Sequence, residues 1–470
     1  MKDFLKRHKQ ILLILAITIA FRLLVGLLTN SYILMQNDSN TYSNFTENIF
    51  LGQVNVQRTP LYPLFIIFVR LISFSPNGYL PIVIAQEIVS LISLVFMYKI
   101  IARYTKSNKM IYIFTLIYAF EPTIWHWNKC ILTESLSISL GVIFAWLLIR
   151  HIDKPKIWSA ITIAIGSFLL IMLRPSFLAL FAIIIGFWIV RFIISKIDRK
   201  QSVIGFGVSL ACMLLLFGYM HLNYLQNGWN SITNVDTANQ IMNLIEGDIY
   251  QNPKYQDIVN SFTENPLWSD RENTAFVLGW IPISNEEFGF NFSPEYVRNY
   301  VKDSIKLHFE DYVKYTGEKF IISFFSPVAS IIPFSLDRSI DNFNYATYET
   351  WANGMIMHWN ILTISFLTYL LFFPLFFVYI YIFWVIIYAI VKWAKGKLDW
   401  IDLGFGLIIF AQLATIVINA PPQNYDRLFQ PALPFLFVLV YKHISEGRFD
   451  WAQMKWANKL FKTSSQDTKI

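Results

Sequence analysis

The chain has 470 residues, of which 55% are hydrophobic and 17% aromatic, and its mean hydropathy is +0.46. Only 15% of the residues are charged, compared with roughly 25% in a typical soluble globular protein, so this composition excludes a soluble enzyme of this length. The formal net charge of +7 would elsewhere suggest nucleic acid as a partner. In such an apolar chain it more simply reflects the excess of Lys and Arg in cytoplasmic loops, and we expect no nucleic-acid partner.

About ten stretches are long and apolar enough to predict transmembrane helices, which need about 20 residues each to cross a bilayer. They lie near residues 10–29, 79–102, 110–126, 132–150, 157–173, 176–195, 202–222, 360–391, 399–419 and 428–445. The first stretch follows a basic segment and has no small-residue cleavage site, so we expect a retained anchor rather than a signal peptide. The predicted fold is therefore an all-α, multi-pass integral membrane protein.

The distribution of charge between alternate connections predicts the orientation of these spans. Lys and Arg dominate in residues 1–9, 103–109, 150–156, 191–200 and 392–397 and in the C-terminal tail, whereas acids outnumber bases on the other side. Because basic residues are retained on the cytoplasmic side, both termini are predicted to be cytoplasmic. The long connections then face outward from the plasma (inner) membrane.

These assignments divide the chain into three predicted parts. Residues 1–222 form a seven-helix N-terminal module, whose first outer loop, 30–78, is expected to hold the site. Within that loop the apolar segment 60–75 is too short to span, so we expect a juxtamembrane helix lying in the interface. Residues 223–359 form a mixed extracytoplasmic region with a second interfacial helix near 319–334, or alternatively a hairpin that dips into the membrane. Residues 360–470 form a three-helix module with a cytoplasmic tail.

Ionisable residues near the outer ends of the spans are the candidates for chemistry, because burial against lipid is costly for a charge. Asp38 begins the first outer loop, where it could also serve as a helix N-cap. Arg58 precedes the interfacial segment and could bind either lipid headgroups or the phosphate of a specific substrate. Glu134 enters the fourth span, where a carboxylate is favoured at a helix N-terminus in any case. Glu121, at the outer end of the third span, could be a surface charge.

Further basic residues stand at outward turns. Arg174 precedes Pro175 between the fifth and sixth spans, and Arg427 precedes Pro431 and Pro434 at the last span. Against an outer face that is rich in acids, these arginines require an explanation, and an anionic lipid phosphate supplies one.

Taken together, the order of these residues resembles the GT-C superfamily of integral-membrane glycosyltransferases that use lipid-linked sugars. The branch with protein O-mannosyltransferases and aminoarabinose transferases is the most similar. The residues that resemble the family pattern are, in chain order, Asp38 with Tyr42, Arg58 with Pro60-Leu61-Tyr62-Pro63, Thr133-Glu134, Arg174-Pro175, and Arg427 with Pro431 and Pro434. It covers residues 10–200 and, more loosely, the last 50 residues.

The resemblance implies transfer of a sugar from a polyprenyl-phosphate donor in the lipid bilayer to an extracytoplasmic glycan, lipid or protein, by inverting displacement. It implies that Asp38 is the general base and that Glu134 is a second catalytic carboxylate, which orients the acceptor or the base. Donor phosphate would be bound by Arg58, Arg427 and Arg174. Tyr42, Tyr62, Glu121 and Tyr425 would line the substrate cavity. No residue is assigned to a metal, because few hard oxygen ligands are visible in the sequence. A divalent metal, Mg or Mn, is nevertheless the one cofactor that stays open.

Three other functions remain open at this point, one of which is a structural or receptor protein that binds a ligand with residues 223–359. A polysaccharide polymerase or O-antigen ligase also has a large outer loop and outer-face arginines, although the early Asp and the Arg-Thr-Pro-Leu-Tyr-Pro run argue against it. A transporter or lipid flippase would place ionisable residues deep in its spans, and Arg22 and Glu87 are the candidates for that.

Overall fold

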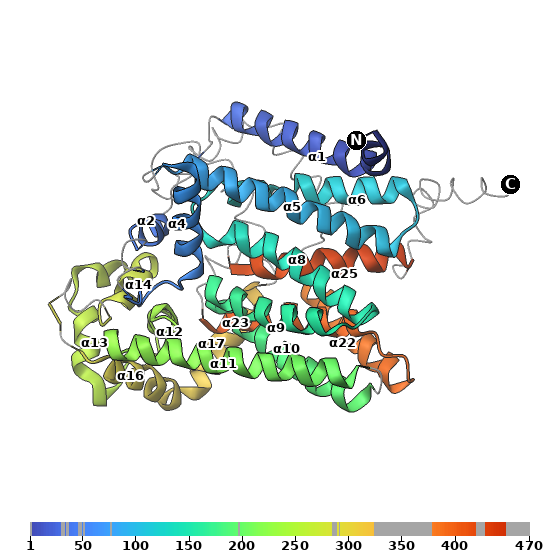
Figure 1. The fold of residues 1–470 in the computed structure, drawn as a ribbon. Coiled ribbons are helices and arrows are strands. Elements are labelled where there is room, and N and C mark those ends of the chain that lie inside the picture. Colours follow the sequence, from blue (N-terminus) through green and yellow to red (C-terminus); the bar gives the residue numbers. More distant parts are fainter. Residues whose placement is uncertain are drawn as a thin grey trace.

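The computed structural model describes residues 2–29, 33, 37–45, 49, 52–75, 78–195, 198–283, 289–290, 292–323, 378–419 and 428–447. Throughout these ranges the regular elements are helices, which agrees with the predicted all-α class. Figure 1 shows the long helices running side by side as a bundle.

Among the described residues, six helical segments are long and apolar enough to cross a membrane. They are Lys9–Leu27 within α1 (Lys2–Thr29), α5 (Leu80–Tyr104), α8 (Thr133–Asp153), Pro175–Ile194 including α10 (Leu178–Ile194), α11 (Arg199–Asn227) and α23 (Trp400–Asn419).

The other four predicted spans correspond to shorter helices: α6 (Asn108–Phe120), α9 (Ile157–Leu173), α22 (Val378–Ala394) and α25 (Leu433–Ser445). Residues 360–377 of the predicted span 360–391 lie outside the described residues. The structure thus supports an integral membrane protein with six candidate spans by length and composition, and the count of about ten is not confirmed.

The two ends of the bundle differ in their elements (Figure 1). At one end lie α2 (Asn37–Ser43), α4 (Leu61–Ser73), α13 (Gln256–Thr263), α14 (Arg271–Trp280) and α16 (Pro294–Leu307). At the opposite end lie the C-termini of α5, α8 and α25 and the turn between α22 and α23. The basic connections predicted to be cytoplasmic therefore gather at one end, and the predicted outer elements gather at the other.

Close helix contacts in the core depend on two glycines. A Cβ at Gly141 of α8 would lie 3.0 Å from Pro434 Cγ of α25, and a Cβ at Gly205 of α11 would lie 2.6 Å from Trp188 Cε2 of α10. Small residues at such positions allow membrane helices to approach closely, where packing rather than the hydrophobic effect holds them together.

Beyond α11 the chain forms a helical region with its own buried cluster. It contains α12 (Val235–Glu246), α13 (Gln256–Thr263), α14 (Arg271–Trp280), α16 (Pro294–Leu307) and α17 (Phe309–Ser323). Ile241, Ile258 and Tyr300 are fully buried within it. Asn243 Nδ2 donates a hydrogen bond to the carbonyl oxygen of Ile418 at 3.0 Å, which joins this region to α23. Residues 324–334 of the second predicted interfacial helix lie outside the described residues, as does the alternative hairpin.

Candidate functional site

Asp38 and Arg58 form an ion pair at the predicted outer end of the bundle. Asp38 lies in the first turn of α2, and its Oδ1 is 2.7 Å from Arg58 Nη2. Arg58 Nε also donates a hydrogen bond to Thr41 Oγ1 at 2.8 Å, and its guanidinium lies 4.8 Å from the ring centre of Tyr42. One short helix thus supplies a carboxylate, a hydroxyl and an aromatic face to the same arginine.

The next layer is a pair of tyrosines. The rings of Tyr42 and Tyr62 are 5.1 Å apart in an edge-to-face arrangement. Tyr62, in the first turn of α4, is fully buried, and its hydroxyl donates to Gln86 Oε1 at 2.6 Å. Gln86 Nε2 in turn donates to the carbonyl oxygens of Asn128 at 2.8 Å and Cys130 at 2.9 Å. The tyrosine pair therefore connects the first outer loop to α5 and to the segment before α8.

Glu134 and Arg174 form a second ion pair, with Glu134 Oε1 3.2 Å from Arg174 Nη1. Glu134 lies in the first turn of α8, where its charge is favourable, and Arg174 follows the last residue of α9. The side chain of Glu134 is 0% exposed and that of Arg174 is 9% exposed. A charge so deeply buried is tolerated when it is paired, which this geometry provides.

The two ion pairs belong to one cluster. Thr59, the residue after Arg58, donates from Oγ1 to the carbonyl oxygen of Leu173, the residue before Arg174, at 3.0 Å. Burial raises the pKa of the Tyr62 hydroxyl, and the nearby Tyr42 and Glu134 raise it further. Tyr62 therefore stays protonated and acts as a donor. We call the following six residues the outer cluster: Asp38, Tyr42, Arg58, Tyr62, Glu134 and Arg174.

The remaining predicted site residues are placed elsewhere or lie outside the described part of the chain. Glu121 is buried at the junction of α6 and α7 (Pro122–Lys129) and is not among the residues whose contacts define the outer cluster. Tyr425 and Arg427 fall in residues 420–427, outside the described residues.

Some polar residues next to the cluster were not singled out from the sequence. Gln86 is one, and Asn128 is another: its Nδ2 donates to Glu87 Oε2 at 3.1 Å, and its Oδ1 accepts from Ser135 at 2.7 Å. The signal for Gln86 was available, since an uncharged polar residue within an apolar span needs a partner. Arg22, also within a span, pairs with Glu87 at 2.5 Å.

Lys129 is a third residue that the sequence did not single out. It is 5% exposed, and burial lowers the pKa of its amine to about 8, with Glu87 opposing that shift. Its Nζ lies 5.5 Å from the ring centre of Trp125. A buried amine beside the polar network adds positive charge at this end of the bundle.

The described residues of the cluster do not fit a divalent metal. Among them the structure contains no group of three or more His, Cys, Asp or Glu residues that could hold an ion. Asp38 and Glu134 each direct a carboxylate oxygen to an arginine, whereas Mg²⁺ and Mn²⁺ prefer several hard oxygen ligands.

Comparisons with known proteins leave the family of this chain unassigned. No family model and no curated protein matches it. Among solved structures, the archaeal oligosaccharyltransferase AglB from Archaeoglobus fulgidus, in complex with an inhibitory peptide and a dolichol-phosphate, matches with a TM-score of 0.45 and 12% sequence identity. The match covers 99% of this chain and 53% of that chain, so this chain spans about half the length of AglB.

Proposed function

We propose that this protein is a glycosyltransferase that takes a sugar from a polyprenyl-phosphate-linked donor and transfers it to an extracytoplasmic acceptor. The observation that carries the proposal is the pairing of Asp38 with Arg58 beside α4. Asp38 is 28% exposed and Arg58 is 14% exposed at the side chain, so substrate can reach both. A carboxylate that accepts a proton and an arginine that binds phosphate are the two groups such a transfer requires.

The α4 helix supports the lipid nature of the donor. One of its faces, with Tyr62, Ile66 and Val69, is buried against the bundle. The other face leaves Phe68 and Leu71 exposed. An apolar face that begins beside the outer cluster gives a polyprenyl chain a surface to lie on while its phosphate stays near Arg58.

In the proposed reaction, an acceptor hydroxyl or amine attacks the anomeric carbon of the donor. The new bond from the acceptor to carbon forms as the bond from carbon to the phosphate oxygen breaks, and the phosphate leaves with the electron pair. Asp38 takes the acceptor proton, and the arginine charge stabilises the phosphate as it becomes more negative. Because the attack is a single displacement, the anomeric centre inverts.

The ion pair gives Arg58 a double use in this mechanism. In the structure, Arg58 Nη2 donates a hydrogen bond to Asp38 Oδ1 at 2.7 Å, which orients the carboxylate. When Asp38 is protonated its attraction for the guanidinium falls, and Arg58 becomes available to the departing phosphate. The positive charge therefore shifts toward the phosphate at the time when that phosphate needs it.

Glu134 has a different proposed role from Asp38, because its side chain is 0% exposed. A residue so buried does not meet the acceptor in this conformation. We assign it as a positioning residue that orients Arg174, whose charge adds to the positive potential of the outer cluster.

Arg22 and Glu87 are the two ionisable residues that the sequence offers for transport, and they pair with each other. Ser90 accepts a further hydrogen bond from Arg22 Nη1 at 3.1 Å. A pair satisfied in this way is explained by helix packing alone.

The test compares transfer by the wild type and by Asp38→Asn and Arg58→Ala, each expressed in cells that lack the native protein. Both substitutions should abolish modification of the acceptor while the protein remains inserted and folded. Asp248→Asn and Arg271→Ala are matched controls in the outer helical region, where their side chains are 70% and 41% exposed, and they should leave transfer unchanged. Near-normal transfer by Asp38→Asn would show that Asp38 is not the general base.

A further inference from the structure

A second polar site lies at the opposite end of the bundle from the outer cluster. There the C-termini of α5, α8 and α25 meet the turn between α22 and α23 around a cavity of about 610 Å³. We call this cavity the inner pocket. Its lining residues are Arg103, Tyr104, Ile152, Lys392, Lys397, Leu398, Asp399, Trp400, Ile401, Lys442 and Glu446. The predicted orientation of the spans places it at the cytoplasmic side of the membrane.

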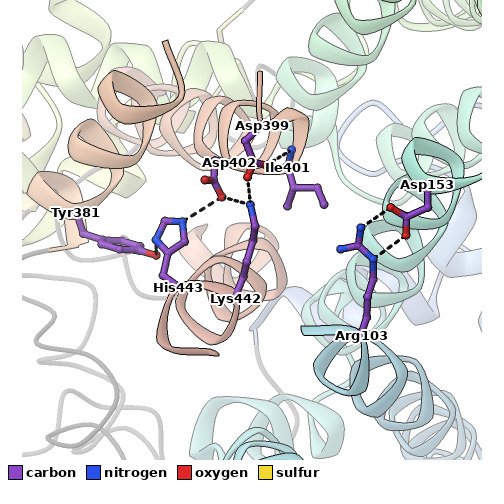
Figure 2. Close-up of polar contacts among 8 residues, drawn as sticks. All are labelled: Arg103, Asp153, Tyr381, Asp399, Ile401, Asp402, Lys442 and His443. Carbon is purple, nitrogen blue, oxygen red and sulfur yellow. Dashed lines mark hydrogen bonds and ion pairs between the residues drawn. The ribbon is translucent and has the colours of Figure 1, made fainter. Parts of the chain in front are cut away.

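Lys442 is fixed in this pocket by a buried network, which Figure 2 shows. Its Nζ lies 2.5 Å from both Asp399 Oδ2 and Asp402 Oδ1, and its side chain is 3% exposed. Behind it, His443 Nε2 lies 3.0 Å from Asp402 Oδ1, and His443 Nδ1 lies 2.9 Å from the Tyr381 hydroxyl. The network holds the ammonium in one position, and an ammonium has three donors of which these carboxylates take two.

Arg103 is held in the same way from the other wall (Figure 2). Its Nε donates to Asp153 Oδ2 at 2.6 Å, and its Nη2 donates to Asp153 Oδ1. A guanidinium has five N–H donors in a planar fork, so this two-point contact leaves the Nη1 donors for another partner. Arg103 thus has a fixed orientation and spare donors.

Asp399, in contrast, already has donors for both of its oxygens, whereas Glu446 is exposed at the end of α25. Asp399 Oδ1 accepts hydrogen bonds from the backbone N–H groups of Ile401 at 3.1 Å and Asp402 at 3.2 Å. Its Oδ2 accepts from Lys442 at 2.5 Å. A carboxylate with both oxygens engaged in this way caps the start of α23 and is poorly placed to bind a cation.

Two further cations stand at the pocket with no ion-pair partner among the described residues. Lys397 is exposed, and Lys392 is half-buried with its Nζ 4.8 Å from the ring centre of Tyr388. Arg103 and Lys442 also have N–H donors beyond those that bond to Asp153, Asp399 and Asp402. The inner pocket therefore has cationic N–H donors that no carboxylate among these three accepts from. Such convergence favours an anion with several acceptor oxygens.

We propose that the inner pocket binds a phosphate group. A phosphate has several oxygens, which suits donors that arrive from different walls of the pocket. Trp400 and the apolar side chains beside it give a wall for the part of the ligand next to the phosphate. The phosphate belongs either to the headgroup of an anionic phospholipid or to a soluble compound. Ile387, Ile390 and Trp393 on α22 are exposed apolar residues beside Lys392, and they provide a surface for lipid chains.

The experiment measures ligand binding by the purified full chain in detergent micelles, through the midpoint of thermal unfolding. One arm adds phosphatidylglycerol to the micelles, and the other adds inorganic phosphate at constant ionic strength made up with chloride. A ligand that binds the folded state raises the midpoint with concentration, which yields a Kd. At least one arm should show a saturable rise. The double variant Lys392→Gln/Lys397→Gln should weaken that Kd by about tenfold or more, since each lysine contributes attraction to the anion.

Lys395→Gln is the matched control, because Lys395 is exposed in the same turn but does not line the pocket. It should leave the Kd unchanged. A response to phosphatidylglycerol alone identifies a lipid headgroup, and a response to inorganic phosphate alone identifies a soluble ligand. No saturable rise in either arm, or an equal loss in Lys395→Gln, would overturn the proposal. If the double variant does not fold, the single variant Lys397→Gln at the exposed rim gives the same comparison. Sugar transfer is not part of this readout, so the result is independent of the function proposed above.

Discussion

Thr59 Oγ1 donates a hydrogen bond to the carbonyl oxygen of Leu173 at 3.0 Å, across 114 residues of sequence. Thr59 is buried and follows Arg58, which pairs with Asp38. Leu173 precedes Arg174, which pairs with Glu134. This single bond joins the first outer loop to the end of α9. The relative position of the two arginines therefore depends on it.

Thr59→Val should loosen this junction. The substitution keeps the shape of the side chain but leaves the buried Leu173 carbonyl without its donor, at a cost of about 1–3 kcal/mol. We expect a lower midpoint of thermal unfolding and a reduced rate of sugar transfer. Thr162→Val is the control, because Thr162 bonds only within its own helix at an exposed position, and it should change neither quantity. Equal behaviour of the two variants would show that the junction does not matter.

Removing one partner of the buried Glu134 and Arg174 pair should be worse than removing both. Arg174→Met leaves the fully buried carboxylate of Glu134 without this arginine, and breaking a buried pair typically costs about 3–5 kcal/mol. The double variant Arg174→Met/Glu134→Gln removes the uncompensated charge and should recover part of the loss. Thermal unfolding of the wild type, both single variants and the double variant measures this coupling. Additive effects of the two substitutions would contradict it.

Tyr62→Phe should reduce transfer without changing the pH dependence of the reaction. The hydroxyl donates to the buried Gln86 at 2.6 Å, so its loss frees the amide that ties α5 to the Asn128–Cys130 segment. Because burial raises the pKa of Tyr62, the wild-type hydroxyl stays protonated and adds no limb to the pH profile. Tyr296→Phe, which removes an exposed hydroxyl bonded to Asp257, is the control and should transfer normally. A basic limb that disappears in Tyr62→Phe would show that Tyr62 titrates.

Lys319 should make the stability of the protein depend on pH in the alkaline range. Burial lowers the pKa of its amine to about 8 in the folded protein, while Glu246 opposes that shift, and the ordinary value is 10.5. Between these values the unfolded chain binds the proton more fully, so the free energy of unfolding rises as pH increases. From pH 7.5 to 9.5 we expect a gain on the order of 1–2 kcal/mol relative to Lys319→Met, which has no amine to titrate. Parallel pH dependence of the two proteins would refute this.

Much of the outer cluster could be predicted from the order of residues along the chain. The placement of Asp38 and Tyr42 after the first span and of Arg58 before an apolar segment predicted that they share a site, and the structure brings them into contact. The apolar segment 60–75 was predicted to be a helix, and α4 occupies Leu61–Ser73. These features are local, so hydropathy and neighbouring residues contain enough information.

The pairing within the cluster could not be predicted. Arg174 pairs with Glu134, and which arginine meets which acid depends on the packing of α8 against α9. Hydropathy alone also did not predict where the helices end. The predicted span 110–126 corresponds to α6, which has only 13 residues and ends at Phe120, before Glu121 and Pro122. Likewise, the lysines of the inner pocket indicated only the orientation of the spans, and the fold was needed to bring the four segments of the pocket together.

We propose that this protein consumes a polyprenyl-phosphate-linked sugar through Asp38 and Arg58. The most direct measurement is mass spectrometry of polyprenyl-phosphate sugars and cell-surface glycans from cells that make the wild type, Asp38→Asn, or no protein. We predict that one lipid-linked sugar accumulates and one surface modification disappears both in Asp38→Asn and in the absence of the protein. Identical lipid-linked sugars and identical surface glycans in all three would contradict the account.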